Sequence, residues 1–497
     1  MRNTVHLITY ADRFGGGGLA QLSATLRGPL NGLFGGIHLL PFFFPIDGAD
    51  AGFDPIDHTQ IDPRLGAWTD IKDLTQGVQV MADLIVNHVS SRSAQFQDFL
   101  RKGSSSSYRS LFLTSDEVFP AGPSGSDLEA IYRPRPGAPF TLYTFENGES
   151  RLLWTTFTSQ QIDIDVRDPQ GVAYLDRILT TFAENRIESV RLDAVGYAIK
   201  KAGTSCFLLP ETIEFIGGLS KRAHSLGIEV LVEVHSYYRR QIELAHQVPW
   251  VYDFALPPLV LHAFAFRTAK YLKEWIRIRP TNSVTVLDTH DGIGILDIGP
   301  DRSGDHSPGL VPSEELDQLV EWIHTNTSGE SRLATGASAS NLDLYQINCT
   351  FYDAMGRDDL SYLLARAIQF FLPGIPQVYY VGLLAGQNDM ELLAKTGVGR
   401  DINRHFYSPQ ELDLGLKKPV VEDLTRLIRL RNSHAAFRGQ FRLEQGLDHS
   451  LNLRWESGLE FAHLRIWFDD LRYMFEVSAD GGVERFLFAC GLRSQSE

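Results

Sequence analysis

Residues 187–197 read IESVRLDAVGY, an apolar run that ends with an arginine and an aspartate two positions apart. Side chains alternate along a β-strand, so Arg191 and Asp193 share one face if this run is a strand. Because burial of unpaired charge is costly, a charged strand end indicates either a structural ion pair or a functional site. The rest of the chain decides between these two interpretations.

Short apolar or β-branched runs recur along the chain and are mostly separated by helix-compatible segments. Near-continuous apolar strands are typical of a parallel sheet that is covered on both faces. The runs lie at 4–10, 36–43, 77–88, 187–195, 228–235, 251–256, 283–290 and 375–382. Eight such runs with helical spacers predict an α/β chain folded as a (β/α)8 TIM barrel.

Two intervals, after the third and seventh runs, are too long for one crossover helix. Both are rich in Gly, Pro and Ser, as in KGSSSSYRS and FPAGPSGSD, and predict inserted loop-rich subdomains on the rim of the barrel. Alternating segments such as LNLRW and FAHLRIWF predict a small C-terminal antiparallel β domain. The predicted division is a barrel from 1–88, 169–295 and 357–434, subdomain B at 89–168, subdomain B′ at 296–356, and the β domain at 435–497.

Composition narrows the classes of function. The chain has 497 residues, 43% of them hydrophobic, which is enough for a large core. Its net charge of -15 argues against a nucleic-acid partner and against an anionic membrane surface. The first residues lack the apolar run of a secretory signal, and no uninterrupted apolar stretch is long enough to span a membrane. Cys206, Cys349 and Cys490 lack metal-type spacing, so we expect a reduced, cytoplasmic setting.

Acids and histidines gather where four of the predicted strands end. Active sites of such barrels form at the C-terminal ends of the strands. The residues are Asp83, His88, Arg191, Asp193, Glu233, His235, His290 and Asp291. We expect Arg191 to keep Asp193 ionised as a nucleophile, and the apolar neighbours of Glu233 to favour its protonated form as a general acid. Each residue taken singly is more often structural than catalytic, but four buried charge clusters at matching strand ends indicate a catalytic site.

Four motifs in order along the chain resemble the α-amylase superfamily of glycoside hydrolases and transglycosylases. They are DLIVNH (83–88), RLDAVGY (191–197), EVHSYY (233–238) and LDTHDGIG (287–294). Within it, four further segments resemble the sucrose phosphorylases. These are GADAGFDPIDH (48–58), IYRPRPGAPF (131–140), SNLDLYQIN (340–348) and GRDINRH (399–405). The resemblance extends from residue 1 to about 434 and is weak in the C-terminal β domain.

The resemblance implies a retaining double displacement that converts sucrose and phosphate to fructose and α-glucose 1-phosphate without metal or cofactor. It implies Asp193 as nucleophile, Glu233 as general acid/base and Asp291 as transition-state stabiliser. The implied substrate-binding residues are Asp50, Phe53, His88, Phe157, Gln161, Arg191, His235, His290 and Arg400. The implied phosphate and fructose site comprises Arg135, Leu342, Asp343, Tyr345 and Gln346. We hypothesise that the loop moves Asp343 inward for fructose and Tyr345 inward for phosphate. The resemblance also suggests a homodimer.

Three alternatives stay open at this point. A related phosphorylase could act on sucrose 6′-phosphate, glucosylglycerol or glucosylglycerate. A retaining α-glucoside hydrolase would share the three carboxylates and use water in place of phosphate. A non-catalytic binding relative would be expected to lack some of the three carboxylates, which this chain keeps.

Overall fold

A computed structural model describes the chain except residues 49, 134–136, 302–306, 337–345, 480–481 and 490–497. Its centre is a closed barrel of eight parallel strands, in the order β1-β16-β13-β12-β11-β10-β5-β2. The strands are β1 (His6–Thr9), β2 (Gly36–Leu39), β5 (Gln79–Ile85), β10 (Ser189–Asp193), β11 (Glu229–Val232), β12 (Trp250–Asp253), β13 (Ser283–Thr285) and β16 (Ile375–Tyr379). The predicted (β/α)8 barrel is confirmed, and only β12 begins outside its predicted run, by one residue.

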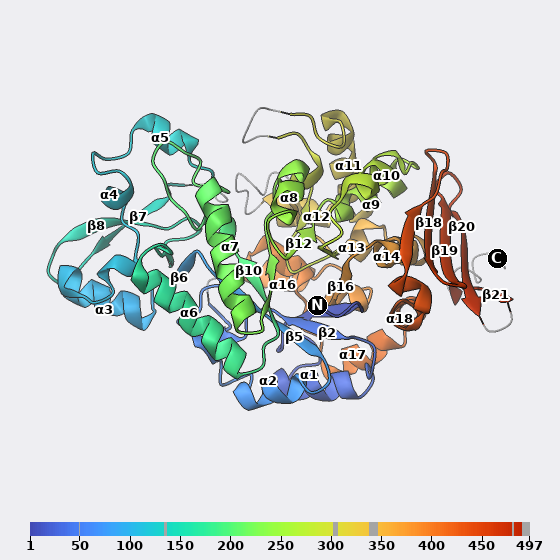
Figure 1. Cartoon of the computed structure of the whole chain (residues 1–497), viewed down its shortest axis with the longest axis horizontal. Helices are drawn as coiled ribbons and strands as arrows, with labels where there is room; N and C mark the ends of the chain where they lie inside the picture. The colour runs from blue at the N-terminus through green and yellow to red at the C-terminus, as the bar shows by residue number, and fades with distance from the viewer. Residues whose placement is uncertain (49, 134–136, 302–306, 337–345, 480–481, 490–497) are drawn as a thin grey trace.

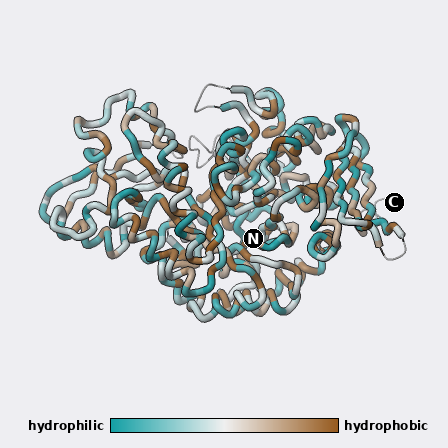
Figure 2. The backbone as a smooth tube through the Cα atoms, viewed as in Figure 1, coloured by the Kyte–Doolittle hydropathy of each residue, from teal (hydrophilic) through white to brown (hydrophobic). Residues whose placement is uncertain are grey.

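Helices surround the barrel, and their sequences explain why they form. In α6 (Pro169–Glu184), Asp168 caps the first turn by accepting a hydrogen bond from the Gln170 amide, and Pro169 takes the first helical position. Buried residues recur three or four apart along α6, which gives it one apolar face. The other large helices are α1 (Gly18–Arg27), α2 (Trp68–Leu74), α7 (Pro210–Ser225), α8 (Tyr238–Ala245), α9 (Leu256–Ala265), α10 (Lys270–Ile278), α14 (Asp359–Phe371) and α18 (Pro419–Ser433). Hydrophobic stretches accordingly cluster toward the middle of the molecule (Figure 2).

The first long excursion leaves the barrel after β5 and occupies one end of the molecule (Figure 1). It contains β6 (His88–Ser90), α3 (Ala94–Lys102), α4 (Ser115–Val118), α5 (Gly125–Ala130), β7 (Phe140–Thr144), β8 (Ser150–Trp154) and β9 (Gln161–Asp163). Strand β9 returns antiparallel to β6, with Asp163 opposite His88. The buried Lys200 ammonium lies 2.8 Å from Asp163 and donates to Asn87 at 2.8 Å. This contact fastens the excursion to the segment that follows β10.

The second excursion follows β13. It contains β14 (Ile293–Gly294), η4 (Leu296–Ile298), α11 (Ser313–Asn326), α12 (Glu330–Gly336), β15 (Gln346–Ile347) and α13 (Phe351–Ala354). Strands β14 and β15 pair antiparallel, with Gly294 opposite Gln346, so the chain returns to the barrel rim where it left. The shorter elements near the rim are β3 (Phe43–Phe44), β4 (Asp57–Ile61), α15 (Tyr380–Leu383), α16 (Met390–Thr396), η6 (Gly399–Asn403) and α17 (Pro409–Leu416). The proposed subdomain boundaries stay a prediction.

The C-terminal sheet is antiparallel, as the alternating pattern predicted. Its five strands are β17 (Gln440–Leu443), β18 (Ser450–Ser457), β19 (Glu460–Trp467), β20 (Arg472–Ala479) and β21 (Gly482–Arg485). It lies at the opposite end of the molecule from the first excursion (Figure 1). The indole of Trp455 donates to the Phe371 carbonyl at 2.6 Å, which joins the sheet to α14. Among the described residues, no helix is both long and apolar enough to cross a bilayer.

Candidate active site

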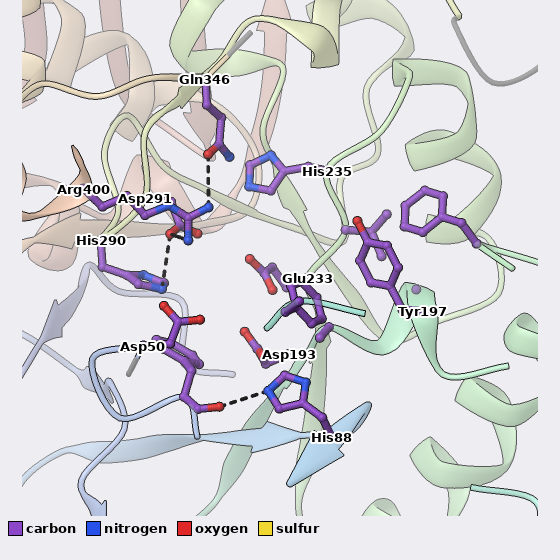
Figure 3. A pocket seen from close by; sticks show the side chains of 16 residues that line it. Asp50, His88, Asp193, Tyr197, Glu233, His235, His290, Asp291, Gln346 and Arg400 are labelled. Carbon is purple, nitrogen blue, oxygen red and sulfur yellow. Dashed lines mark hydrogen bonds and ion pairs between the residues drawn. The ribbon is translucent and has the colours of Figure 1, made fainter. Parts of the chain in front are cut away.

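A pocket that is partly open to solvent lies at the C-terminal ends of the barrel strands. Eleven residues predicted from the sequence line it: Asp50, Phe53, His88, Phe157, Asp193, Glu233, His235, His290, Asp291, Gln346 and Arg400. Figure 3 shows the three carboxylates Asp193, Glu233 and Asp291 facing this common space. Two further predicted residues contact residues of the lining. Arg191 lies 3.3 Å from Asp193, and Gln161 lies 3.0 Å from His88. Arg135, Leu342, Asp343 and Tyr345 lie outside the described residues.

Arg191 holds the floor of the pocket together. Its three guanidinium nitrogens face three different carboxyls: Nε lies 2.5 Å from Asp83, Nη2 3.3 Å from Asp193 and Nη1 3.8 Å from Glu233. The barrel register explains the shortest contact, because Arg191 and Asp83 are directly opposite each other on β10 and β5. His38 adds a 3.0 Å contact to Asp83. Arg191 therefore makes its shortest contact with Asp83, and its contact with the sequence neighbour Asp193 is longer.

The ionisation of Asp193 differs from the prediction. Burial, and then the charge of Glu233, raise the pKa of Asp193 well above its ordinary value, and Arg191 opposes this shift without reversing it. Arg191 alone therefore does not hold the pKa of Asp193 at or below its ordinary value, which differs from the expectation based on their spacing.

Asp291 has the opposite environment. Burial alone would raise its pKa, but Arg400, His290 and Arg404 together hold the pKa of Asp291 well below its ordinary value. The nearest of these groups, the Arg400 guanidinium, lies 2.9 Å from the Asp291 carboxylate. His290 is 3.7 Å from the same oxygen. Asp291 is therefore a fixed negative charge in the pocket.

One wall of the pocket combines aromatic faces with polar groups. The Phe53 ring stacks on His290 at 5.0 Å, and the Phe157 ring meets His88 edge-on at 5.2 Å. Gln161, at the start of β9, lies 3.0 Å from the His88 Nε2 atom and 3.4 Å from the Asp50 carboxylate. Flat apolar faces beside fixed polar groups suit a sugar ring, which has apolar faces and a rim of hydroxyls.

Sequence reasoning missed two aromatic residues of the lining, Tyr197 and Phe207. Their rings lie 4.8 Å apart, and Tyr132 packs on Phe207 at 4.5 Å. Tyr197 lay within the RLDAVGY motif, so its proximity to Asp193 was a usable signal. Phe207 carried no comparable signal, because it follows an irregular segment that no motif covers.

The carboxylate and imidazole atoms of Glu233, His235 and Asp291 lie within 4.8 Å of one another, a spacing that could accommodate a cation. His235 already directs Nδ1 at Asp297, 3.2 Å away, and Asp291 already pairs with Arg400. We therefore assign no metal to these residues.

Comparison with known proteins gives one consistent family. Residues 32–235 match the α-amylase catalytic domain model. The chain is 59% identical over 468 residues to a sucrose phosphorylase of Agrobacterium vitis, covering 94% of this chain and 96% of the relative. It is 54% identical to a sucrose phosphorylase of Bifidobacterium adolescentis, covering 92% and 90% of the two chains.

A solved structure gives the same answer for the fold. The crystal structure of sucrose 6F-phosphate phosphorylase from Thermoanaerobacter thermosaccharolyticum superposes with a TM-score of 0.90 at 39% identity, covering 98% of this chain and 99% of that one. The agreement extends across the C-terminal sheet as well as the barrel. The chain therefore belongs to the sucrose phosphorylase family of the α-amylase superfamily.

Proposed function

We propose that this chain catalyses the reversible phosphorolysis of sucrose to α-glucose 1-phosphate and fructose, and transfers glucose to other acceptors as a side reaction. The observation that carries the proposal is the convergence of Asp193, Glu233 and Asp291 on one pocket, in which Asp193 and Asp291 have opposite electrostatic environments. A retaining mechanism requires one carboxyl as nucleophile and a second as acid, and Asp193 and Glu233 supply the two. The 54–59% identity to sucrose phosphorylases supports sucrose as the donor.

In the first half of the reaction, the ionised Asp193 carboxylate attacks the anomeric carbon of the glucosyl unit. The bond to the fructose oxygen breaks, and Glu233 delivers a proton to that oxygen, so that neutral fructose leaves. Asp291 stays negative and stabilises the positive charge that develops on the sugar ring. The product of this step is a β-glucosyl ester of Asp193.

In the second half, a phosphate oxygen attacks the same carbon from the opposite face. Glu233 accepts the proton of the attacking phosphate, and the Asp193 ester bond breaks to regenerate the carboxylate. Two inversions leave the α configuration in glucose 1-phosphate. Arg191 positions Asp193 throughout, through its 3.3 Å contact.

We assign the glucosyl unit to the wall that contains Asp50, Phe53, His88, Phe157, Gln161, His290 and Arg400. Gln346, which accepts a hydrogen bond from Arg400 at 3.3 Å, and His235 border the part of the pocket that we assign to the acceptor (Figure 3). The roles of Arg135, Leu342, Asp343 and Tyr345 in binding phosphate or fructose stay predictions, as does the loop movement.

The cytoplasmic location and the homodimer are also kept as proposals. Cys206 and Cys349 are buried free thiols, which supports a reducing environment.

One assay tests the function. The purified chain is incubated with sucrose, with and without phosphate, and the sugar products are identified. We expect glucose 1-phosphate and fructose in equal amounts when phosphate is present, with slow release of glucose when it is absent. Glucose release at the same rate in both mixtures, with no glucose 1-phosphate, would establish a hydrolase instead.

The same assay with sucrose 6′-phosphate, glucosylglycerol and glucosylglycerate as donors tests the related phosphorylases. The proposal requires that sucrose give the highest kcat/KM of the four donors.

A further inference from the structure

Asp297, on η4, is fully buried and belongs to none of the family motifs seen in the sequence. All three of its described hydrogen-bond donors come from the segment that follows β11. The Ser236 amide and the Gln241 side chain donate to Oδ1, at 3.2 and 2.7 Å, and the His235 Nδ1 atom lies 3.2 Å from Oδ2. A buried carboxylate that receives these contacts fixes the position of His235 relative to the pocket.

Gly294 makes this arrangement possible. A Cβ atom at position 294 would lie 2.3 Å from the Asp297 Oδ2 atom and 3.3 Å from the His235 Nδ1 atom. Any side chain there would therefore displace the carboxylate from the imidazole. The close approach of the β14 backbone is an independent sign that the contact between Asp297 and His235 is built into the fold.

The other ring atoms of His235 are constrained as well. Its ring stacks on Phe254 with centroids 3.8 Å apart and planes 15° apart, which sets the plane of the imidazole. Nε2 is buried and has no hydrogen-bond partner among the described residues. The ring borders the pocket together with Glu233, Asp291 and Gln346 (Figure 3). Nε2 thus lacks a protein partner among the described residues, in a ring that lines the pocket.

We propose that Asp297 is a positioning residue that orients His235 as a cationic donor, with its Nε2–H directed at the phosphate acceptor. The inference rests on the proposed function and deepens it. A carboxylate can only accept hydrogen bonds, so the proton on Nδ1 is fixed toward Asp297 and any second proton must lie on Nε2. Asp297 would thereby help phosphate to compete with water for the glucosyl-enzyme.

The charges around His235 agree with this role. Burial acts against its protonation, but Asp297, Glu233 and Asp291 together raise the pKa of His235. The cations that face these acids are Arg400, 2.9 Å from Asp291, and Arg191, 3.8 Å from Glu233. On the packed face, Phe254 contributes no charge. A protonated imidazole forms a stronger hydrogen bond to a phosphate oxygen than a neutral one does.

Asp297→Asn tests the inference. The amide oxygen is expected to stay with the two donors Ser236 and Gln241, which places the amide NH2 against the His235 Nδ1 atom. His235 then keeps a neutral Nε2–H tautomer and loses its charge. We expect the KM for phosphate to rise about tenfold, while hydrolysis of sucrose in the absence of phosphate stays within about twofold. The ratio of phosphorolysis to hydrolysis therefore falls.

The pH dependence gives a second readout. His235 is charged below its pKa, so the KM for phosphate should rise as the pH increases through that pKa. In Asp297→Asn this rise should begin at lower pH, because the variant lacks the charge that raises the pKa. The ionisation of phosphate itself affects both proteins equally, so the difference between the two profiles reports on the protein.

Matched variants separate positioning from folding. Asp301→Asn removes another buried acid of the same excursion, one that pairs with Arg240 at 3.0 Å, and should leave the ratio unchanged. Gly294→Ala displaces the Asp297 carboxylate sterically and should lower the ratio as Asp297→Asn does. In a His235→Gln background, Asp297→Asn should add little.

The possible outcomes are distinct. If the wild type forms glucose 1-phosphate, but Asp297→Asn and Gly294→Ala leave the ratio and the pH profile unchanged, the inference alone is overturned. A proportional loss of phosphorolysis and hydrolysis, with a lower melting temperature, would reduce Asp297 to a structural role and also overturn it. If the wild type forms no glucose 1-phosphate, the proposed function fails and the inference fails with it.

Discussion

Replacing Arg191 with lysine tests the floor of the pocket most directly. Arg191 faces Asp83, Asp193 and Glu233 with three separate nitrogens, whereas lysine has a single ammonium. The ammonium should stay with Asp83, which is fully buried and makes the shortest contact at 2.5 Å. Arg191→Lys therefore keeps the charge but leaves Asp193 without its hydrogen bond.

The size of the effect follows from that one lost contact. The side chains of Arg191 and Asp193 are only 2% and 15% exposed, so solvent screens their interaction weakly. A hydrogen bond between charged groups contributes about 1.5–3 kcal/mol, which corresponds to a fall in kcat/KM of roughly tenfold to 150-fold. A more distant cation also allows the pKa of Asp193 to rise further. The acidic limb of the rate profile should then move to higher pH, because less of the nucleophile is ionised at a given pH.

The assay is the steady-state release of glucose 1-phosphate from sucrose and phosphate across a range of pH, paired with urea denaturation. Arg366→Lys is the matched control. Arg366 is equally buried and donates to Asp288 at 2.6 Å, but it lies outside the pocket. It should lose stability and, where folded, keep its kcat. Arg191→Lys with more than half of the wild-type kcat/KM and an unchanged pH profile would refute the reasoning.

Three further outcomes are expected. Asp193→Ala should abolish glucose 1-phosphate formation from sucrose, and near-normal turnover would mean that another residue is the nucleophile. Gln161→Leu, which removes the contacts to His88 and Asp50, should raise the KM for sucrose roughly fivefold with a smaller change in kcat, as initial rates would show. Although burial opposes it, Arg191 lowers the pKa of Asp83 from 3.8 to about 2. The ionised form of Asp83 therefore stabilises the fold above about pH 4, and this contribution is lost as the pH falls toward 2. The difference in free energy of unfolding between the wild type and Asp83→Asn should therefore become smaller as the pH falls from about 4 toward 2. A difference that stays constant over this pH range would contradict the lowered pKa of Asp83.

The barrel was predictable because parallel strands covered on both faces must be apolar along their length, and few other structures produce eight such runs with helical spacers. The pocket lining was predictable for the same reason: polar residues that end buried strands converge at one mouth. The residues contributed by excursions, such as Phe157 and Gln161, came from the family resemblance and had no such physical signal.

Two features could not be predicted from local sequence. The spacing of Arg191 and Asp193 suggested that they form the main pair, but the barrel register places Asp83 opposite Arg191, and register is a property of the assembled sheet. Asp297 is 62 residues from His235, and only the return of the chain through β14 brings them together. The raised pKa of Asp193 likewise depends on how deeply the site is buried.

Lys200 limits how this enzyme could be recombined with its relatives. Its buried ammonium contacts Asn87 before the first excursion, Asp163 near the end of that excursion, and the Tyr197 carbonyl beyond it. A chimera could take residues 89–168 from a relative that has no acid at the position of Asp163. The buried Lys200 cation would then be unpaired, which would lower the free energy of unfolding by several kcal/mol. The excursion that contributes Phe157 and Gln161 therefore cannot be exchanged between relatives on its own. It has to be exchanged together with the loop after β10. We therefore expect specificity for the glucosyl substrate and the surroundings of the nucleophile to evolve together.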